Sequence, residues 1–278
     1  MRLFQRAWHI AVNDVLISDQ ETGLACDFSV KKTLKPDPNT ASVKIYNLSK
    51  ATREKLTNPK RASLRIEAGY VERLSQIYLG DVRALSPGEI RGPDIVTELS
   101  SGDGGQEIQK ANLQIPIGAK TPNGTALTAI AKALGVGLGN VPKVSAALAS
   151  KGSAVFPRGT VLTGNVSRVL SDFCRSAGLE WSVQDGVIQI LDLGKGLETN
   201  PYVLSSDSGM IGAPAIGSDG KVSVSTLMIP ELRPGMRVMF ETFAVNGVYR
   251  ISEAEYQGST HGNEWTIKLS CEKPKVAP

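Results

Sequence analysis

Three groups of side chains in this sequence of 278 residues are of types that could carry chemistry, and their spacing decides whether they do. The first is Ser29 with Lys32, which have the S-x-x-K spacing of an activated serine nucleophile. That spacing works on a helix, where the lysine lies one turn from the serine. The alternating residues around this pair predict a strand instead, on which the two side chains face opposite sides. A serine nucleophile is therefore not predicted.

The second and third groups are the histidines and a pair of carboxylates. His9 and His261 are the only histidines, and neither has companion ligands or bases at motif spacing, which argues against a catalytic triad or a two-histidine metal site. His261 is predicted in an exposed turn. Glu253 and Glu255 share one face of a predicted strand, but glycosidic cleavage also needs a sugar-sized cleft and one carboxyl group with a raised pKa. No catalytic, cofactor-binding or metal-binding residue is predicted.

Two glycine-rich stretches and three cysteines complete the survey of chemistry. GDGGQE, residues 102–107, and GVGLGN, residues 135–140, lack the strand, G-x-G-x-x-G and helix context of a phosphate site. Cys26, Cys174 and Cys271 match no metal-binding or redox spacing. They are expected to be buried as free thiols, which suits a reducing compartment.

Composition limits the class of protein. With 41% hydrophobic and 21% charged residues, the chain is expected to be folded throughout, and its length suggests two or three domains. A net charge of +4 and 5% aromatic residues are low for a nucleic-acid-binding surface, and the basic residues at 50–61 are interpreted as a solvated helix face. The sequence shows neither a signal peptide nor a run of eighteen apolar residues, so no membrane span is expected.

The first hundred or so residues predict short strands separated by turns. Apolar and polar residues alternate over 26–30, 41–48, 63–70, 77–85 and 94–101. Within KTLKPDPNTASVKIYNLS, residues 32–49, the two prolines oppose strand pairing and Asn39-Thr40 turn the chain, so a corner between two strands is expected. After it, SKATREKL predicts one short helix with Ser49 as its N-cap.

The middle of the chain predicts two helices and a hairpin. NGTALTAIAKALG, residues 123–135, has apolar residues at helical spacing, with Asn123 or Thr125 as the N-cap. A second helix over 166–177 has a continuous apolar stripe, formed by Val166, Val169, Leu170, Phe173, Cys174 and Ala177. Asp185-Gly186 then predicts a hairpin that pairs Val183 with Ile188 and Trp181 with Ile190, with its apolar face covered by the second helix. The connector over 135–159 is expected to have little regular structure.

The last seventy residues predict strands again. Pro234-Gly235 marks a tight turn, and two later strands are joined through Gly258 to Asn263. The final strand places its apolar residues on one face, namely Trp265, Ile267, Leu269 and Cys271. Many short strands without helical cover protect their edges by closing into a barrel or by pairing with neighbours, so a small barrel is expected.

Two long stretches resemble a known family. DFSVKKTLKPDPNTASVKIYNLSKATREKL, residues 27–56, together with YLGDV, resembles the N-terminal region of baseplate hub proteins from contractile-tailed bacteriophages. GVYRISEAEYQGSTHGNEWTIKLSC, residues 247–271, resembles the C-terminal strand pair of those proteins. This tail-tube-like hub family is related to the hub part of type VI secretion spikes.

The resemblance implies a fold and domain organisation. It implies a mainly β protein with a smaller α+β part, built as two small tube-type β-barrels plus an inserted helix-and-hairpin domain. The corresponding domains are a first barrel over 1–112, the inserted domain over 113–204 and a second barrel over 205–278. No catalytic residue carries over from the family, no enzymatic activity is expected, and no cofactor is implied.

The resemblance also implies partners and a place of action. The expected protein is a structural virion protein, a homotrimer that joins the hexameric tail tube to the trimeric central spike and lines the channel for genome and tape-measure passage. Its expected partners are the tail tube protein, the central spike protein, the tape-measure protein and other baseplate proteins, with DNA met only by passage through the channel. It would lie in the tail baseplate of the virion after assembly in the bacterial host cytoplasm.

Other functions stay open on the sequence alone. A tail ring or distal tail protein shares the same setting, and stoichiometry separates it from a hub. A peptidoglycan-binding or cell-wall-degrading tail module belongs to another class, and the lack of histidine and carboxylate motifs argues against it. A nucleic-acid-binding barrel is disfavoured by the weak charge and the few aromatic residues.

Overall fold

The computed structural model of the protein describes residues 5–18, 23–57, 62–150 and 155–275, which form two compact units. Unit 1 comprises Met1–Thr33, Asn39–Asp103 and Gly196–Pro278, and unit 2 comprises Leu34–Pro38 and Gly104–Lys195. Strand accounts for 52% and helix for 18% of the residues, which confirms the mainly β class with a smaller α+β part. The expected domain bounds, 1–112, 113–204 and 205–278, stay a prediction, since compactness separates only the residues of unit 2 from the rest.

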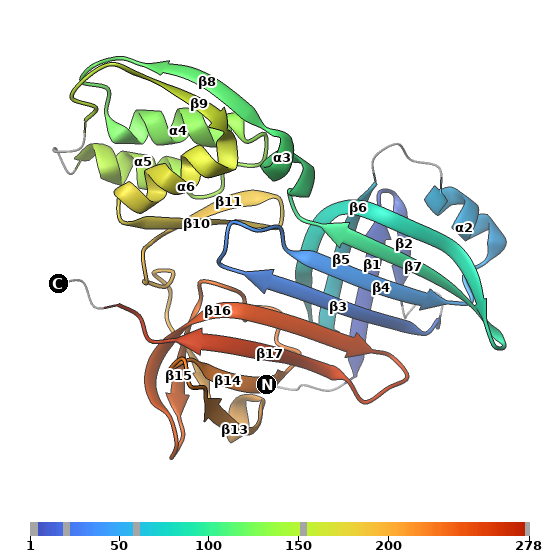
Figure 1. The fold of residues 1–278 in the computed structure, drawn as a ribbon. Helices are drawn as coiled ribbons and strands as arrows, with labels where there is room; N and C mark the ends of the chain where they lie inside the picture. Colours follow the sequence, from blue (N-terminus) through green and yellow to red (C-terminus); the bar gives the residue numbers. More distant parts are fainter. Residues whose placement is uncertain (1–4, 19–22, 58–61, 151–154, 276–278) are drawn as a thin grey trace. The chain divides into compact units, whose positions relative to one another are not determined.

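Unit 1 is built on one large sheet, antiparallel except where β12 pairs with β15 (Figure 1). Its first-half strands are β1 (Arg6–Val12), β2 (Val15–Ser18), β3 (Cys26–Thr33), β4 (Thr40–Tyr46), β5 (Ser63–Tyr70), β6 (Arg73–Arg91) and β7 (Asp94–Gly102). Its second-half strands are β12 (Tyr202–Leu204), β13 (Met210–Ile216), β14 (Val222–Leu227), β15 (Arg237–Glu241), β16 (Asn246–Ser259) and β17 (Trp265–Glu272). The main path of paired strands is β13-β14-β17-β16-β3-β4-β7-β6-β5-β1-β2, and β15 joins β12 to β16.

Alternating residues put one face of β3 and one face of β17 in the core, as the sequence predicted. Cys26, Phe28 and Val30 of β3 are buried, and the final strand β17 buries all of its four predicted core residues. The chain turns between β3 and β4, which pair antiparallel, so the expected corner is confirmed. Helix α2 (Lys50–Thr57) follows β4, and the Ser49 hydroxyl accepts a hydrogen bond from the Thr52 amide at 3.1 Å, which confirms the predicted N-cap.

The two halves of the large sheet are joined directly by β3 and β16. These strands pair antiparallel from Thr33 opposite Glu253 to Asp27 opposite Ser259. Phe28 and Trp265 meet edge to face beneath this joint, with ring centroids 5.5 Å apart. The Trp265 indole N–H also donates to the Gly69 carbonyl at 2.9 Å, so a single buried side chain contacts both halves. Unit 1 therefore has one continuous hydrophobic core.

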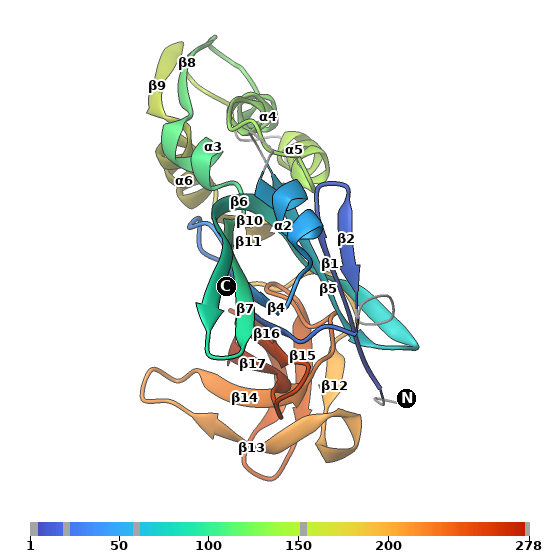
Figure 2. The same ribbon diagram turned by 90° about the vertical axis from the view of Figure 1, so that its right-hand side faces the viewer.

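Strand pairing among the described residues is open and does not close into a barrel. The two small barrels expected from the sequence are not present as separate closed rings, because β3 and β16 use their neighbouring edges to pair with each other. The strands at the two ends of the sheet, β2 and β13, have features that oppose pairing with a further strand. Strand β2 has four residues, and β13, orange in Figure 2, contains Pro214 within a shift of register against β14.

Unit 2 combines helices with two small two-stranded sheets around its own core. Its elements are α3 (Gly105–Lys110), β8 (Asn112–Ile117), α4 (Asn123–Ala133), α5 (Val141–Ser150), β9 (Thr160–Asn165), α6 (Val166–Ser176), β10 (Leu179–Gln184) and β11 (Val187–Asp192). Strands β8 and β9 pair with each other, as do β10 and β11. No helix in the described part of the chain has the length and apolar character needed to cross a membrane.

The predicted helix and hairpin of unit 2 are confirmed. Strands β10 and β11 pair Trp181 with Ile190 and Val183 with Ile188, and both turn residues, Asp185 and Gly186, have positive φ. A side-chain hydrogen bond links the helix to the hairpin: the Trp181 indole N–H donates to the Ser171 hydroxyl of α6 at 2.9 Å. The apolar stripe of α6 therefore covers the hairpin as expected.

Several elements of unit 2 were mispredicted or missed. The connector over 135–159 was expected to lack regular structure, but it contains α5, whose Val141, Val144 and Leu148 have helical spacing that the surrounding small residues obscured. Helix α4 begins after Pro122 rather than with a side-chain cap from Asn123 or Thr125, because proline already has the dihedral angle suited to a helix start. Strands β8 and β9 and helix α3 were not predicted.

Candidate functional surface

A polar surface covers the outward side of the central strands of the large sheet in unit 1. Alternation turns one side chain in two away from the core, and on these strands the outward residues are hydroxyl, amide or charged groups. We call this surface the polar face; it comprises Asp27, Ser29, Lys31, Ser42, Lys44, Glu98, Ser100, Ser223, Ser225, Glu253, Glu255, Gln257, Thr266, Lys268 and Ser270. It crosses the joint between β3 and β16 without interruption.

Charges on the polar face alternate from strand to strand. In one row Lys268, Glu255 and Lys31 are direct neighbours on β17, β16 and β3. In another, Lys44 lies between Asp27 and Glu98. Opposite charges at directly opposed positions stabilise a sheet, whereas like charges there destabilise it. With three lysines and four carboxylates, the polar face has almost no net charge.

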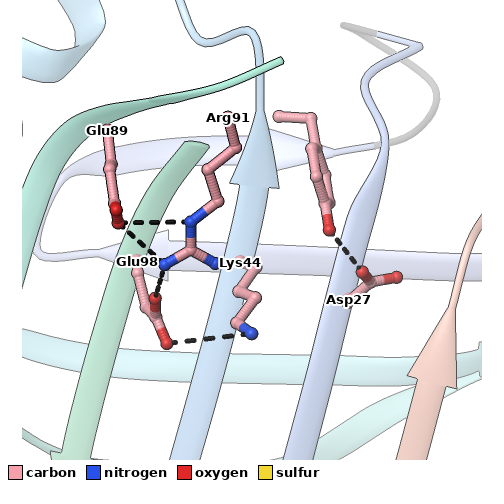
Figure 3. A network of polar contacts seen from close by, with 6 residues as sticks. Asp27, Lys44, Glu89, Arg91 and Glu98 are labelled. Carbon is pink, nitrogen blue, oxygen red and sulfur yellow. Dashed lines mark hydrogen bonds and ion pairs between the residues drawn. The ribbon is translucent and has the colours of Figure 1, made fainter. Parts of the chain in front are cut away.

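One edge of the polar face ends in a network of ion pairs (Figure 3). Arg91 contacts Glu89 at 2.7 Å and Glu98 at 3.3 Å, and Glu98 reaches toward Lys44 at 4.0 Å. These residues come from β6, β7 and β4, so the network connects the projecting β6–β7 hairpin to the middle of the sheet. Nearby, the Tyr46 hydroxyl donates to the Asp27 carboxylate at 2.8 Å.

These contacts shift the pKa values of the groups that donate. The hydrogen bond to Asp27 raises the pKa of Tyr46, since the phenol must keep its proton to donate. The hydrogen bond to Glu89 raises the pKa of Arg91, and the hydrogen bond to Glu253, whose carboxylate lies 2.7 Å from Lys31, raises the pKa of that lysine. Each contact therefore favours the charged form of the lysine or arginine and the neutral form of the phenol.

Two adjoining hollows open on the polar face where β3, β4 and β16 meet the β16–β17 loop. The first is about 520 Å³ and the second about 500 Å³, and Asp27 and Ser259 line both. The rest of their lining is mainly hydroxyl, amide, carboxylate and backbone groups. His261, which lines the second hollow, lies with its ring Nδ1 3.0 Å from the Thr260 hydroxyl in the β16–β17 loop. The described residues contain no group of three metal-ligating side chains.

The structure explains why Ser29 and Lys32 do not form a nucleophilic pair. Ser29 is exposed on the polar face, whereas Lys32 is 1% exposed on the core side of β3, as predicted for strand neighbours of odd spacing. The Lys32 ammonium group donates to the Ile77 carbonyl at 3.1 Å. Ile77 lies in a shift of register between β5 and β6, which releases its carbonyl from the sheet ladder.

The histidines and the paired carboxylates lie apart. His9 contacts Glu67 at 3.1 Å, and His261 is exposed in the loop between β16 and β17, as predicted. Glu253 and Glu255 share the polar face, but Glu253 is bound to Lys31 and Glu255 accepts from the Gln257 amide at 2.8 Å. Glu253 therefore contacts the neighbouring strand, whereas the hydrogen bond to Glu255 comes from its own strand.

The three cysteines are buried and free, as predicted. Burial raises the pKa of Cys174 and of Cys271 to about 12, and it raises the pKa of Cys26 well above its ordinary value. A thiol that keeps its proton is a poor nucleophile and a poor metal ligand. These residues are packing groups of the two cores.

The glycine-rich stretch at 135–140 serves packing within unit 2. Gly137 exchanges backbone hydrogen bonds with the β10–β11 hairpin, and a Cβ on Gly139 would lie 2.1 Å from the Ile188 carbonyl oxygen. Asn140 completes the attachment, since its side chain both donates to the Ile190 carbonyl and accepts from the Ile190 amide. The stretch at 102–107 spans the end of β7 and the start of α3, a helix of six residues.

Sequence reasoning did not single out the polar face or the β6–β7 hairpin. The signal was present in the alternating polar positions of 26–30 and 41–48. However, strand order decides which polar positions gather on one surface, and the pairing of β3 with β16 joins residues more than two hundred positions apart.

Solved structures define the class of protein to which this fold belongs. A tail protein from Neisseria meningitidis MC58 matches with a TM-score of 0.64 at 10% identity, over 97% of this chain and 97% of that one. The 43 kDa tail protein of prophage MuSo2 from Shewanella oneidensis matches with a TM-score of 0.63 at 9% identity, over 96% and 98%. The chain therefore has the fold of phage tail proteins.

The same fold extends to type VI secretion. The E. coli c3393 protein, described as a type VI secretion component similar to the T4 tail proteins gp27 and gp5, matches with a TM-score of 0.56 at 8% identity. That match covers 96% of this chain and 77% of the other. No curated protein matches the chain.

A family model identifies the family within this class. The model of the baseplate hub gp41 family matches residues 10–271, so the chain belongs to that family. The resemblance to baseplate hub proteins is thereby confirmed, and the chain is a structural protein of the phage tail baseplate. Because the family is structural and not enzymatic, the cell-wall-degrading alternative is set aside.

Proposed function

We propose that the chain is the trimeric hub that joins the hexameric tail tube to the trimeric central spike. On this proposal three copies surround a channel through which the genome and the tape-measure protein pass. The chain would contact the tube protein, the spike protein, the tape-measure protein and other baseplate proteins, and would assemble in the host cytoplasm before it enters the virion.

The observation that carries this proposal is the polar face. A surface along which DNA slides must be wetted and must not hold phosphates, because each lysine or arginine bound to a phosphate adds a salt-dependent attraction. The polar face is rich in serine, and its lysines are set beside carboxylates on neighbouring strands. We therefore assign it to the wall of the channel.

The construction of unit 1 supports the proposed symmetry. On either side of the joint the sheet continues through three antiparallel strands, β3-β4-β7 in one half and β16-β17-β14 in the other. Each half would supply one tube-type module, as expected from the sequence, so a trimer of chains would present six modules to a hexameric tube. The direct pairing of β3 with β16 would keep the two modules of a chain in fixed register.

Mass in solution tests the stoichiometry. Light scattering behind a sizing column, at several protein concentrations and with the spike protein added, is expected to give a species near three times the chain mass of 29.6 kDa. A hexamer of the chain would instead support the alternative of a tail ring or distal tail protein. A chain that stays monomeric even with the spike present would contradict the hub proposal.

A further inference from the structure

Unit 1 contains a cluster of buried polar side chains at the end of the sheet where the chain departs from this unit. The cluster consists of Lys32, Asn39, Tyr78, Ser101 and Asp103, each no more than 2% exposed. Lys32 lies near the end of β3, Asn39 directly before β4, Tyr78 in the first part of β6, and Ser101 and Asp103 at and directly after the end of β7. The pairing of β3, β4, β7 and β6 brings these positions together. A core of strands rarely buries so many polar groups in one place without hydrogen bonds that hold them.

Asn39 occupies the middle of this cluster. Its side-chain oxygen accepts from the Thr33 amide at 2.9 Å, and its side-chain amide lies 3.4 Å from the Asp103 carboxylate. Its backbone carbonyl accepts from the Asp103 amide at 3.0 Å. A single residue thereby satisfies backbone donors of two segments that are distant in sequence.

The positions of these three residues in the chain are the reason for the inference. Unit 1 ends at Thr33, resumes at Asn39 and ends again at Asp103. Residues 34–38 and the segment that begins at Gly104 belong to unit 2. Asn39 therefore forms hydrogen bonds with Thr33 and Asp103, the two residues after which the chain leaves unit 1.

Tyr78 and Ser101 form a second set of buried hydrogen bonds on β6 and β7. The Tyr78 hydroxyl donates to the Ser101 hydroxyl at 3.0 Å, and Ser101 donates in turn to the Asp81 carbonyl at 2.8 Å. Gly80 makes this arrangement possible, because a Cβ there would lie 2.4 Å from the Tyr78 hydroxyl oxygen and 3.1 Å from the Asp103 Cα. Linked buried hydrogen bonds of this kind reinforce one another and open cooperatively.

We propose that Asn39 locks this junction of unit 1. The chain leaves or re-enters the unit at three points, after Thr33, before Asn39 and after Asp103, and we call these points chain crossings. On this proposal the three crossings open together or not at all. The lock is a conformational device of unit 1. It couples the segment over 34–38 to the start of the segment over 104–195. Without the lock, these two connections would fluctuate independently, as surface connections do. It also gives the Pro36 and Pro38 segment a fixed base at both of its ends.

Hydrogen exchange on the full-length protein tests the lock without any substitution. Exchange is measured at single-residue resolution for the Thr33 and Asp103 amides over a series of sub-denaturing urea concentrations. The proposal expects both amides to be protected and to share one dependence on urea, as one cooperative opening requires. Different dependences on urea for the two amides would overturn it.

Substitution of Asn39 provides the second test. Asn39→Ala is expected to speed exchange at both Thr33 and Asp103 by about tenfold or more. It removes the acceptor of the Thr33 amide and the side-chain amide beside the Asp103 carboxylate. Because alanine keeps the backbone carbonyl that accepts from the Asp103 amide, faster exchange at Asp103 requires that the two crossings open together. Ser42→Ala on β4, three residues after Asn39, is the control and should leave both rates unchanged, since Ser42 lies outward on the polar face. Exchange at Leu269 of β17 reports any general loss of stability. If Asn39→Ala accelerates only the Thr33 amide, the crossings open separately and the lock does not exist.

Discussion

The joint between the two halves of the sheet requires a glycine, because an aromatic ring fills the space beside it. Gly258 of β16 lies directly opposite Phe28 of β3, and the phenylalanine ring occupies the space where a side chain would begin. A Cβ on Gly258 would lie 2.2 Å from that ring. The ring cannot easily retreat, because it packs against Trp265.

Gly258→Ala is therefore expected to destabilise unit 1 by about 1–3 kcal/mol through overpacking. Urea unfolding followed by tryptophan fluorescence measures the change, since Trp265 reports on the joint. Gly118→Ala is a suitable control, because its new Cβ would find its nearest neighbour at an ordinary 3.6 Å. Equal stabilities for the two variants would contradict the description of the joint.

The buried thiols make a prediction about alkaline pH. Burial raises the pKa of Cys174 from the usual 9.0 to about 12, so the folded chain keeps this proton where the unfolded chain loses it. The unfolded state thus binds fewer protons above pH 9, and the free energy of unfolding must fall as pH rises from 9 toward 12. The loss for one thiol approaches about 1.4 kcal/mol per pH unit.

Comparison of the wild type with Cys174→Ala isolates this effect, because every other group that titrates in this range is common to both. Urea unfolding at pH 8, 9.5 and 10.5 should show the stability difference shifting in favour of the variant as the pH rises. In parallel, a thiol reagent at pH 8 should modify no cysteine of the native protein and all 3 in denaturant. Rapid labelling of the native protein would show that the thiols are accessible.

At the scale of elements, the N-terminal cap of helix α6 contributes to the stability of the helix that covers the hairpin of unit 2. Asn165 caps this helix, and its side-chain oxygen accepts from the Ser167 amide at 3.1 Å and from the Arg168 amide at 3.3 Å. The cap satisfies two backbone donors that have no partner within the helix. The helix in turn covers the apolar side of the β10–β11 hairpin.

Asn165→Ala should lower the stability of unit 2 by about 1 kcal/mol through loss of the cap. Thermal unfolding followed by far-UV circular dichroism provides the measurement. Asn165→Asp keeps the acceptor and places a negative charge at the helix N-terminus, so it should restore most of the lost stability. Failure of aspartate to restore stability would mean that Asn165 acts through its other contact, with the Gln109 carbonyl.

Elements with a strong local signal were predictable from the sequence, and those set by small residues or by distant pairing were not. Asp185-Gly186 fixes a two-residue turn, so the register of the hairpin followed directly. Helix α5 was missed because its alanine- and serine-rich sequence resembles a connector. The β1–β2 hairpin was missed as well, although Asn13, with a φ of 50°, forms its turn.

At the scale of the whole molecule, the sequence predicted the class and the family resemblance, but not the surface that would line a channel. Each strand of the polar face shows its alternation locally. The surface as a whole exists only because β3 meets β16, and no local rule predicts a pairing between strands so far apart in the chain. The same pairing replaces two separate closed barrels with one continuous sheet.

If the polar face lines the channel, added positive charge there should slow DNA passage. Phage particles with Ser100→Arg in the hub are expected to assemble and to eject their genomes more slowly, with the defect relieved at high salt, because the new cation binds passing phosphates. Ala51→Arg on helix α2 adds the same charge on an exposed position away from the polar face. Equal ejection rates for both variants and the wild type would argue against a channel position for Ser100.

Electron cryo-microscopy of the assembled baseplate tests the central claim most directly. The predicted result is three copies of the chain around the tail axis, between tube and spike, with Ser42, Ser100 and Lys268 of the polar face turned toward the lumen. Six copies in a ring, or three copies with the polar face turned away from the axis, would contradict the account.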